Sequence, residues 1–202
     1  TPAGSPLMVH ARALQAELQA ELGQGYRVEV GMGVGNPSVA RAIEALRGCS
    51  EIRILPLFPQ YAGATVGSVL DASYAALRTA VNPPPVQVVP PFYAHRGYLD
   101  AVATVALPIL EEFQPDRLVY SFHGLPETQV KRAGEAEGRR CLSEGCCDTP
   151  SAFCYRNHCL ATMRGLTERL GGGELAYQSR LGRAAWLAPS LEEVLVRLAT
   201  QG

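Results

Sequence analysis

Patterns typical of helices and strands alternate along the whole chain, and this alternation limits the possible fold more than any other feature. Stretches with apolar residues at helical spacing are separated by short apolar or β-branched runs. Repeated units of this kind form parallel sheets flanked by helices, so we predict an α/β fold with doubly wound parallel sheets. The expected helices are residues 5–22, 36–46, 65–80, 98–113, 155–170 and one from 190, and the expected strands are 26–30, 52–57, 86–89, 118–122 and 175–179.

Proline residues mark a division near the middle of the chain. Residues 82–85 read Asn-Pro-Pro-Pro, and two further prolines stand at positions 90 and 91. Such stretches are typical of linkers, so we predict two domains, residues 1–91 and 92–202. Because the chain begins at Thr1 and opens directly onto a helix, we expect a fragment that is incomplete at both ends.

The composition excludes several classes of partner. A net charge of −1 gives no basic surface for nucleic acid, and 47% hydrophobic residues suffice for a real core. No apolar run approaches the ~20 residues that a membrane helix needs, and the N-terminus has no signal-peptide pattern. We predict a cytoplasmic globular protein with no nucleic-acid partner, and peripheral membrane association and oligomeric state stay open.

A single histidine stands at the end of a predicted strand. The apolar run 118–122 reads as a buried strand, and Gly124 and Pro126 end it directly after His123. Ligands of doubly wound sheets bind outside the carboxyl ends of the strands. A neutral imidazole there can bind a metal ion or accept a proton near neutral pH, although a strand-end histidine can also simply bond a loop carbonyl.

A second stretch, residues 55–68, follows another predicted strand. It combines an aromatic ring and polar groups with small residues that let a flat ligand approach closely. The alternative is an ordinary strand-to-helix loop. The candidate binding residues in this stretch are Gln60, Tyr61, Thr65 and Ser68.

Three segments resemble signature segments of the ferrochelatase family, in the family's order and at about its spacings. They are Leu-Pro-Leu-Phe-Pro-Gln-Tyr at 55–61, Ser-Phe-His-Gly-Leu-Pro at 121–126 and Tyr-Gln-Ser-Arg-Leu-Gly-Arg-Ala-Ala-Trp-Leu at 177–187. The resemblance covers essentially the whole chain. It implies two doubly wound domains that hold a porphyrin between them and insert Fe²⁺ in the last step of haem synthesis.

The resemblance also implies roles for individual residues. His123 would be the catalytic histidine, which either binds the incoming Fe²⁺ or accepts a pyrrole proton. Tyr61 and its loop would line the porphyrin site, with Trp186 packed beneath it. The chain departs from the family pattern at Met32-Gly33-Val34, where relatives have Met-Arg-Tyr, and no acidic residue matches the glutamate that partners the histidine near the family's C-terminus.

Five of the six cysteines fall within residues 139–159. The odd number of cysteines there and a cytoplasmic setting argue against disulfides and favour a metal bound by four thiolates. Such a set suits a [2Fe–2S] cluster or a tetrahedral zinc, and the resemblance favours the cluster because some ferrochelatases carry one on internal cysteines. We predict that four of the five, with Cys159 the weakest candidate, are the ligands: Cys141, Cys146, Cys147, Cys154 and Cys159.

Two classes of function follow from these features. The first is a porphyrin metal chelatase, a lyase that acts on protoporphyrin IX or on coproporphyrin III. The second is a non-catalytic iron–sulfur or zinc-binding α/β module. Binding of a metal-free porphyrin distinguishes them, because only the chelatase predicts it.

Overall fold

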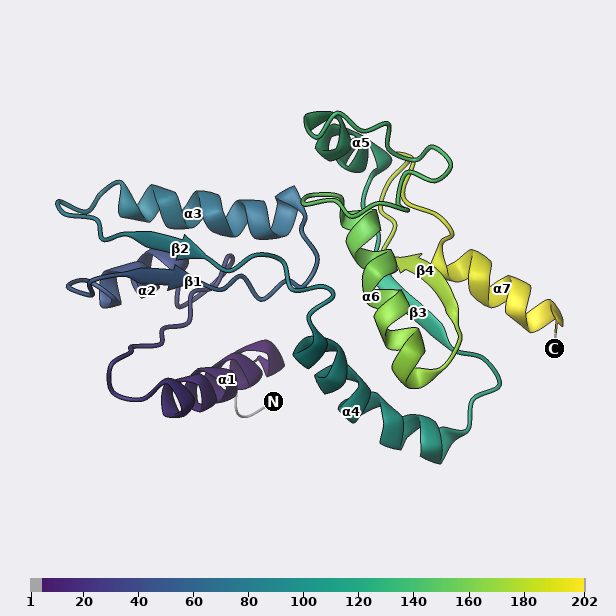
Figure 1. The fold of residues 1–202 in the computed structure, drawn as a ribbon, viewed down its shortest axis with the longest axis horizontal. Helices are drawn as coiled ribbons and strands as arrows, with labels where there is room; N and C mark the ends of the chain where they lie inside the picture. The colour runs from purple at the N-terminus through teal and green to yellow at the C-terminus, as the bar shows by residue number, and fades with distance from the viewer. Residues whose placement is uncertain (1–4, 202) are drawn as a thin grey trace. The chain divides into compact units, whose positions relative to one another are not determined.

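A computed structural model describes residues 5–201 of the chain, which divide into two compact units. The first unit contains residues 5–57 and 64–90, and the second contains residues 58–63 and 91–201. Each unit contains one two-stranded parallel sheet with helices packed against it (Figure 1). The α/β class and the parallel pairing of strands predicted from the sequence are therefore confirmed, while the two-domain assignment at residue 91 stays a prediction.

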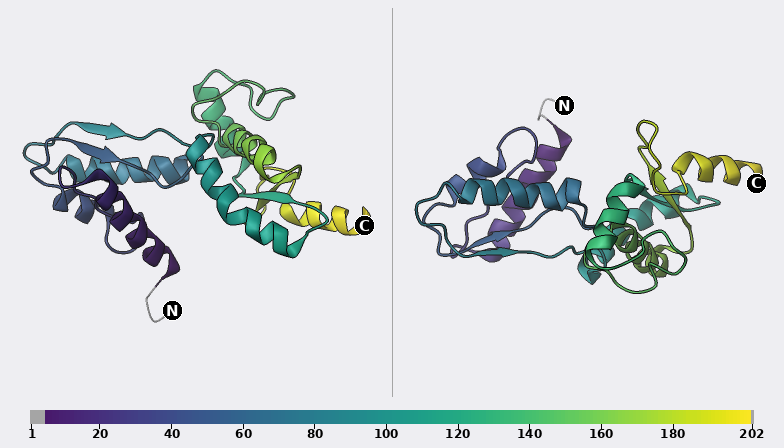
Figure 2. Two further views of the ribbon diagram at one scale, coloured as in Figure 1. Left: turned by 60° about the horizontal axis from the view of Figure 1, so that its bottom comes forward. Right: turned by 90° about the horizontal axis from the view of Figure 1, so that it is seen from above.

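The first unit is built around strands β1 (Ile52–Ile54) and β2 (Val86–Val88), which pair in parallel with Ile52 opposite Val86. Its helices are α1 (Pro6–Leu22), α2 (Val39–Ala45) and α3 (Ser68–Leu77), and a short π-helix, η1 (Gly63–Gly67), leads into α3. Figure 2 shows α3 running alongside the strand pair. The core consists of Ile52, Ile54 and Leu77.

The strand predicted at residues 26–30 is wrong. The side chains of Gln15 and Gln19 on α1 bind the backbone of this segment. Gln15 donates to the Val28 carbonyl over 2.6 Å. Gln19 accepts from the Val28 N–H over 3.0 Å and donates to the Tyr26 carbonyl, also over 3.0 Å. These bonds occupy backbone groups that a β-ladder would need. The alternation of apolar and polar residues was present, but helix α1 takes the place of a neighbouring strand.

The second unit is built around strands β3 (Val119–His123) and β4 (Glu174–Gln178), which pair in parallel so that His123 lies opposite Gln178. Its helices are α4 (Arg96–Phe113), α5 (Glu127–Ala136), α6 (Tyr155–Leu170) and α7 (Leu191–Gln201). The sequence patterns predicted α6 with the observed bounds, but they missed α5. None of the helices in residues 5–201 is both long and apolar enough to cross a membrane.

Helix α6 packs onto both strands of the second unit and against α4 (Figure 1). Leu166 of α6 shares a buried cluster with Leu99 of α4 and Tyr120 of β3, while Cys159 of α6 shares another with Tyr177 of β4. Close packing of α4 on α6 depends on Gly165, where an added Cβ would come within 2.5 Å of Leu99. Helix α6 is thus the central support of the second unit.

Candidate active site

Strand β3 ends on the predicted catalytic residue, His123, whose imidazole is exposed. Its backbone is held in place, because the hydroxyl of Tyr155 at the start of α6 donates to the His123 carbonyl over 2.7 Å. The next residue, Gly124, donates its N–H to the Gln178 carbonyl on β4 over 2.7 Å. The imidazole therefore projects from a strand end that β4 and α6 both fix.

Trp186 lies directly against this strand end. A Cβ at Gly124 would come within 3.3 Å of the indole ring and 3.0 Å of the Gln178 carbonyl, so a larger residue would crowd both groups. The segment that carries Trp186 runs antiparallel to the residues after His123, and the Leu187 N–H donates to the Leu125 carbonyl over 3.0 Å. Trp186 thus lies against the residue that follows His123.

The segment that carries Gln60 and Tyr61 belongs to the second unit. The Gln60 amide donates to the hydroxyl of Thr162 over 2.9 Å, and the Tyr61 N–H donates to Nδ1 of His158 over 3.0 Å. The Tyr61 ring also meets the ring of Phe153 edge-on, with 5.1 Å between their centroids. Gln60 and Tyr61 are thus fixed to α6 and to the loop before it.

One face of α6 supports both predicted parts of the site. Tyr155, His158 and Thr162 stand three and four residues apart, so their side chains share a face of the helix. Tyr155 holds the His123 strand end, and the other two hold the segment with Tyr61. Sequence reasoning missed these supports, since a buried histidine or threonine in a helix gives no distinctive pattern.

Thr65 and Ser68 belong to the first unit, in η1 and at the start of α3. The Ser68 hydroxyl donates within its own helix, to the carbonyls of Ala64 and Thr65 at 3.1 and 2.9 Å. A hydroxyl that bonds the preceding turn is typical of serine within helices. A part for Thr65 and Ser68 in ligand binding therefore stays a prediction.

Four of the cysteines adjoin in the second unit. The sulfurs of Cys146 and Cys147 are 3.8 Å apart, and the thiols of Cys147 and Cys141 lie near enough to Cys154 to lower its pKa. All of them are free thiols. Among residues 5–201, no three or more His, Cys, Asp or Glu side chains already point at one metal position, so ligation would require the thiols to turn toward a common centre.

The environment of Cys154 favours its thiolate. The hydrogen bond from Cys147, together with the backbone N–H groups of Asn157 and Arg156 at the start of α6, lowers the pKa of Cys154 to about 6. The Arg156 guanidinium lies 3.6 Å from the sulfur of Cys146 and 3.7 Å from that of Cys147, where it can offset thiolate charge. Burial raises the pKa of Cys141 to about 11, and the hydrogen bond with Cys154 raises that of Cys147, so these two favour the thiol. A metal bound by all of them would have to displace their protons.

Cys159 shares a buried cluster with Cys154, Val130 and Tyr177. It is fully buried in α6, and burial raises the pKa of its thiol well above the ordinary value. Burial without a charged partner favours the neutral thiol. Cys159 therefore packs as a core residue, while the choice of four ligands among the five cysteines stays a prediction.

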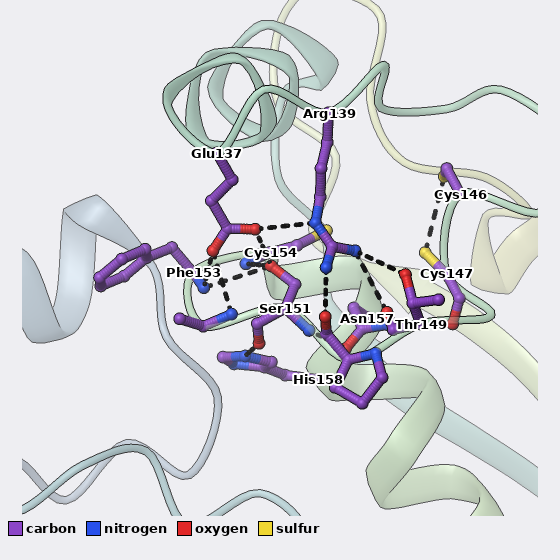
Figure 3. A network of polar contacts seen from close by, with 12 residues as sticks. Glu137, Arg139, Cys146, Cys147, Thr149, Ser151, Phe153, Cys154, Asn157 and His158 are labelled. Carbon is purple, nitrogen blue, oxygen red and sulfur yellow. Dashed lines mark hydrogen bonds and ion pairs between the residues drawn. The ribbon is translucent and has the colours of Figure 1, made fainter.

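A polar network orders residues 139–154, here called the cysteine loop (Figure 3). The Glu137 carboxylate accepts from the N–H groups of Ala152 and Phe153, both at 3.0 Å, and from the Ser151 hydroxyl at 2.5 Å. Glu137 also pairs with Arg139, whose guanidinium donates to the Thr149 and Pro150 carbonyls. The sequence patterns did not predict this network.

Comparison with known proteins decides the family. The family model described as Ferrochelatase matches residues 2–202. The chain belongs to the ferrochelatase family. It is 40% identical over 212 residues to the ferrochelatase of Azotobacter vinelandii, and 37% identical over 210 residues to that of Pseudomonas fluorescens. The ferrochelatase of Coxiella burnetii (strain CbuG_Q212) is 33% identical over 210 residues.

These alignments cover 98–100% of this chain but only part of each relative. The chain spans about three fifths of the length of the curated ferrochelatases it matches, namely 62%, 61% and 58% of the three. The family match confirms the resemblance on which the interpretation of His123, Tyr61 and Trp186 depends. The roles of the individual residues stay predictions.

Proposed function

We propose that the complete protein is a ferrochelatase, a lyase that inserts Fe²⁺ into protoporphyrin IX to form haem. The observation that carries this proposal is His123, an exposed residue at the carboxyl end of a parallel strand, in a chain that matches the family model over residues 2–202. The next residue, Gly124, packs closely against the Trp186 indole. Coproporphyrin III is the alternative macrocycle. The six free thiols fit a cytoplasmic setting, since reduced cysteines persist there.

The reaction removes two N–H protons from the porphyrin as the metal enters. It therefore needs a base, a transient metal ligand and apolar walls that favour the distorted ring of the transition state. The His123 imidazole can be the base or the ligand for the Fe²⁺ substrate. Tyr61 and Trp186 supply aromatic surface for a flat ring, and we assign Gln60, Thr65 and Ser68 to polar contacts with it.

The test is His123→Ala in the complete protein, with iron insertion measured by haem absorbance. Losing a general base reduces turnover ~10²–10⁴-fold, while porphyrin binding should persist as a perturbed Soret band. His95→Ala is the matched control, because His95 is also an exposed histidine of the second unit. Turnover of His123→Ala within tenfold of wild type would remove His123 from catalysis, and a wild-type protein that binds no porphyrin would refute the chelatase.

We further propose that Cys141, Cys146, Cys147 and Cys154 hold a [2Fe–2S] cluster. Their adjoining sulfurs and the lowered pKa of Cys154 support this set, and Arg156 beside two of the sulfurs offsets their charge. Soft thiolate ligands suit an iron–sulfur cluster, with tetrahedral zinc as the alternative occupant. Bound there, the cluster would add metal–sulfur bonds to the network that already orders the cysteine loop.

Purified anaerobically, the complete protein should be reddish-brown and contain iron and acid-labile sulfide in about equal amounts. Cys146→Ser should bleach it, whereas Cys159→Ser should keep the colour, because Cys159 lies outside the ligand set. Colourless protein with bound zinc and no sulfide would refute the cluster in favour of zinc. Bleaching by Cys159→Ser alone would refute the proposed choice of ligands.

A further inference from the structure

His158 is a fully buried histidine whose two ring nitrogens are both hydrogen-bonded. Nδ1 accepts from the backbone N–H of Tyr61 over 3.0 Å, so the ring proton must be on Nε2. Nε2–H then donates to the carbonyl of Ser151 over 2.8 Å. One imidazole thus joins the segment with Tyr61 to the last residues of the cysteine loop.

The ring of His158 has little freedom to move. Tyr93 stacks on it with 3.8 Å between ring centroids and planes 12° apart. Burial lowers the pKa of His158, which keeps the imidazole neutral and maintains the acceptor at Nδ1. A neutral ring clamped by stacking transmits a displacement at one nitrogen to the other.

Ser151 is itself fixed to the cysteine loop on its other sides. Its hydroxyl donates to Glu137 over 2.5 Å and accepts from the N–H of the proposed ligand Cys154 over 2.9 Å. Its own N–H donates to Asn157 over 3.2 Å. The Ser151 carbonyl therefore keeps its position only while the end of the cysteine loop is ordered (Figure 3).

A second contact joins the same two segments. Phe153, also in the cysteine loop, packs edge-on against the ring of Tyr61 at 5.1 Å between centroids. Its N–H donates to Glu137 over 3.0 Å, so its position depends on the same network. The backbone of Tyr61 is thus held through His158 and its ring through Phe153.

We propose that His158 is a positioning residue that couples order in the cysteine loop to the placement of Tyr61, and thereby to porphyrin affinity. This inference rests on the proposed ferrochelatase function. Because Cys154 also donates its N–H to Ser151, a metal bound by its sulfur would add to the network that holds Ser151. Loss of that metal would loosen Ser151, release one side of the imidazole and let Tyr61 move. The cysteine site then affects substrate binding without any contact between its metal and the porphyrin.

Two substitutions in the complete protein test the two hydrogen bonds of the His158 ring separately. The asparagine amide can occupy the place of Nδ1, so His158→Asn keeps an acceptor for Tyr61 and loses the bond to Ser151. The longer glutamine amide can reach the place of Nε2, so His158→Gln keeps the bond to Ser151 and loses that to Tyr61. Leu166→Val, a buried apolar change on the same helix, is the control for general loosening.

Porphyrin affinity is measured by titrating metal-free protoporphyrin IX and following the Soret band. His158→Gln should weaken binding about 3- to 10-fold, as expected for one lost hydrogen bond, and should raise KM for porphyrin with kcat unchanged. Leu166→Val should bind like wild type. Affinity of His158→Gln equal to wild type, or an equal loss in Leu166→Val, would overturn the role of His158.

The coupling is tested by a double-mutant cycle with Cys146→Ser, which removes a proposed metal ligand. In the wild-type background Cys146→Ser should weaken porphyrin binding severalfold, and in the His158→Asn background its effect should be smaller, with only the contact of Phe153 with Tyr61 left to transmit it. Additive effects would overturn the coupling. The coupling would be supported if the effects of the two substitutions on porphyrin affinity are not additive and the His158→Asn variant keeps the visible absorbance of the cluster.

Hydrogen exchange on the wild-type protein needs no substitution and guards against variants that fail to fold. The Tyr61 amide should exchange about tenfold faster after the metal is removed anaerobically by a chelator, while amides in β3 keep their rates. An unchanged Tyr61 rate would overturn the coupling. If wild type bound no porphyrin, the proposed function would fail, yet this exchange measurement would still decide whether His158 links the two segments.

Discussion

Replacement of Glu137 should release the cysteine loop without unfolding the second unit. Glu137 directly follows α5, at a helix end where the dipole disfavours a carboxylate. Its side chain is nevertheless only 15% exposed and accepts hydrogen bonds from Ser151, Ala152 and Phe153 besides its ion pair with Arg139 at 3.1 Å. These contacts outweigh an unfavourable position, so we expect a large local effect when they are lost.

The size of the effect follows from which partners water can replace. Ala152 and Phe153 are exposed, so water can take over their N–H groups at little cost in Glu137→Ala. Ser151 is buried, and a hydroxyl left without its charged acceptor costs ~1–3 kcal/mol. With a further contribution from Arg139, the opening free energy of the loop should fall by about 3 kcal/mol, a factor of about 100.

The assay is amide hydrogen exchange of residues 150–154 in the full chain, read by mass spectrometry. Protection there should fall about 100-fold in Glu137→Ala and about tenfold in Glu137→Gln, which keeps one carbonyl acceptor but loses the ion pair. Amides of β3 and β4 should be unaffected. Glu135→Ala removes an exposed carboxylate from α5 and serves as the control. Unchanged protection in Glu137→Ala would show that other forces order the loop.

Three further expectations concern the second unit. Tyr177 is buried, and its hydroxyl has no hydrogen-bond partner. Tyr177→Phe should therefore stabilise the protein by ~1 kcal/mol and raise Tm by about 2–4 °C. A lower Tm in the variant would mean that the hydroxyl has a partner. Gly124→Ala should destabilise the protein by ~1–3 kcal/mol and alter the fluorescence of Trp186, because the new Cβ would crowd the indole ring. An unchanged fluorescence spectrum and an unchanged Tm would contradict that contact. The Glu193 carboxylate accepts the Ser190 N–H at the start of α7, and this bond lowers the pKa of Glu193, so the cap stabilises α7 above pH 4.5 and is lost as the pH falls through the lower folded pKa. The stability of Glu193→Gln against denaturation should therefore depend less on pH in that range than the stability of wild type. Identical pH profiles of the two proteins would refute the cap.

Local signals in the sequence predicted most helices and strands. Helix α6 was expected with its observed bounds. The helix expected at residues 36–46 is α2, which begins after Ser38, whose hydroxyl accepts the Arg41 N–H over 3.3 Å. Helix α5 was missed because it buries only Val130 and Gly134, too few positions to form an apolar stripe. Elements that depend on nearby residues were therefore predictable, and those with a weak local pattern were not.

The candidate site was predictable where its residues follow strands, and unpredictable where distant residues support them. His123 stands at the end of β3 as expected. The bond from Gln60 to Thr162 joins residues 102 positions apart, and that from Tyr61 to His158 joins residues 97 apart. No local pattern encodes such pairs, and the polar side chains that order the cysteine loop resemble those of any solvent-exposed turn.

The shared face of α6 restricts where this protein family can gain or lose residues. Each residue added to an α-helix turns everything after it by about 100° and shifts it by about 1.5 Å. An insertion between Tyr155 and Thr162 would therefore turn Tyr155 away from His123 or carry His158 and Thr162 away from the segment of Tyr61. Changes in chain length are compatible with this arrangement in the cysteine loop before Ser151 or beyond the C-terminal end of α6, but not in the first two turns of the helix.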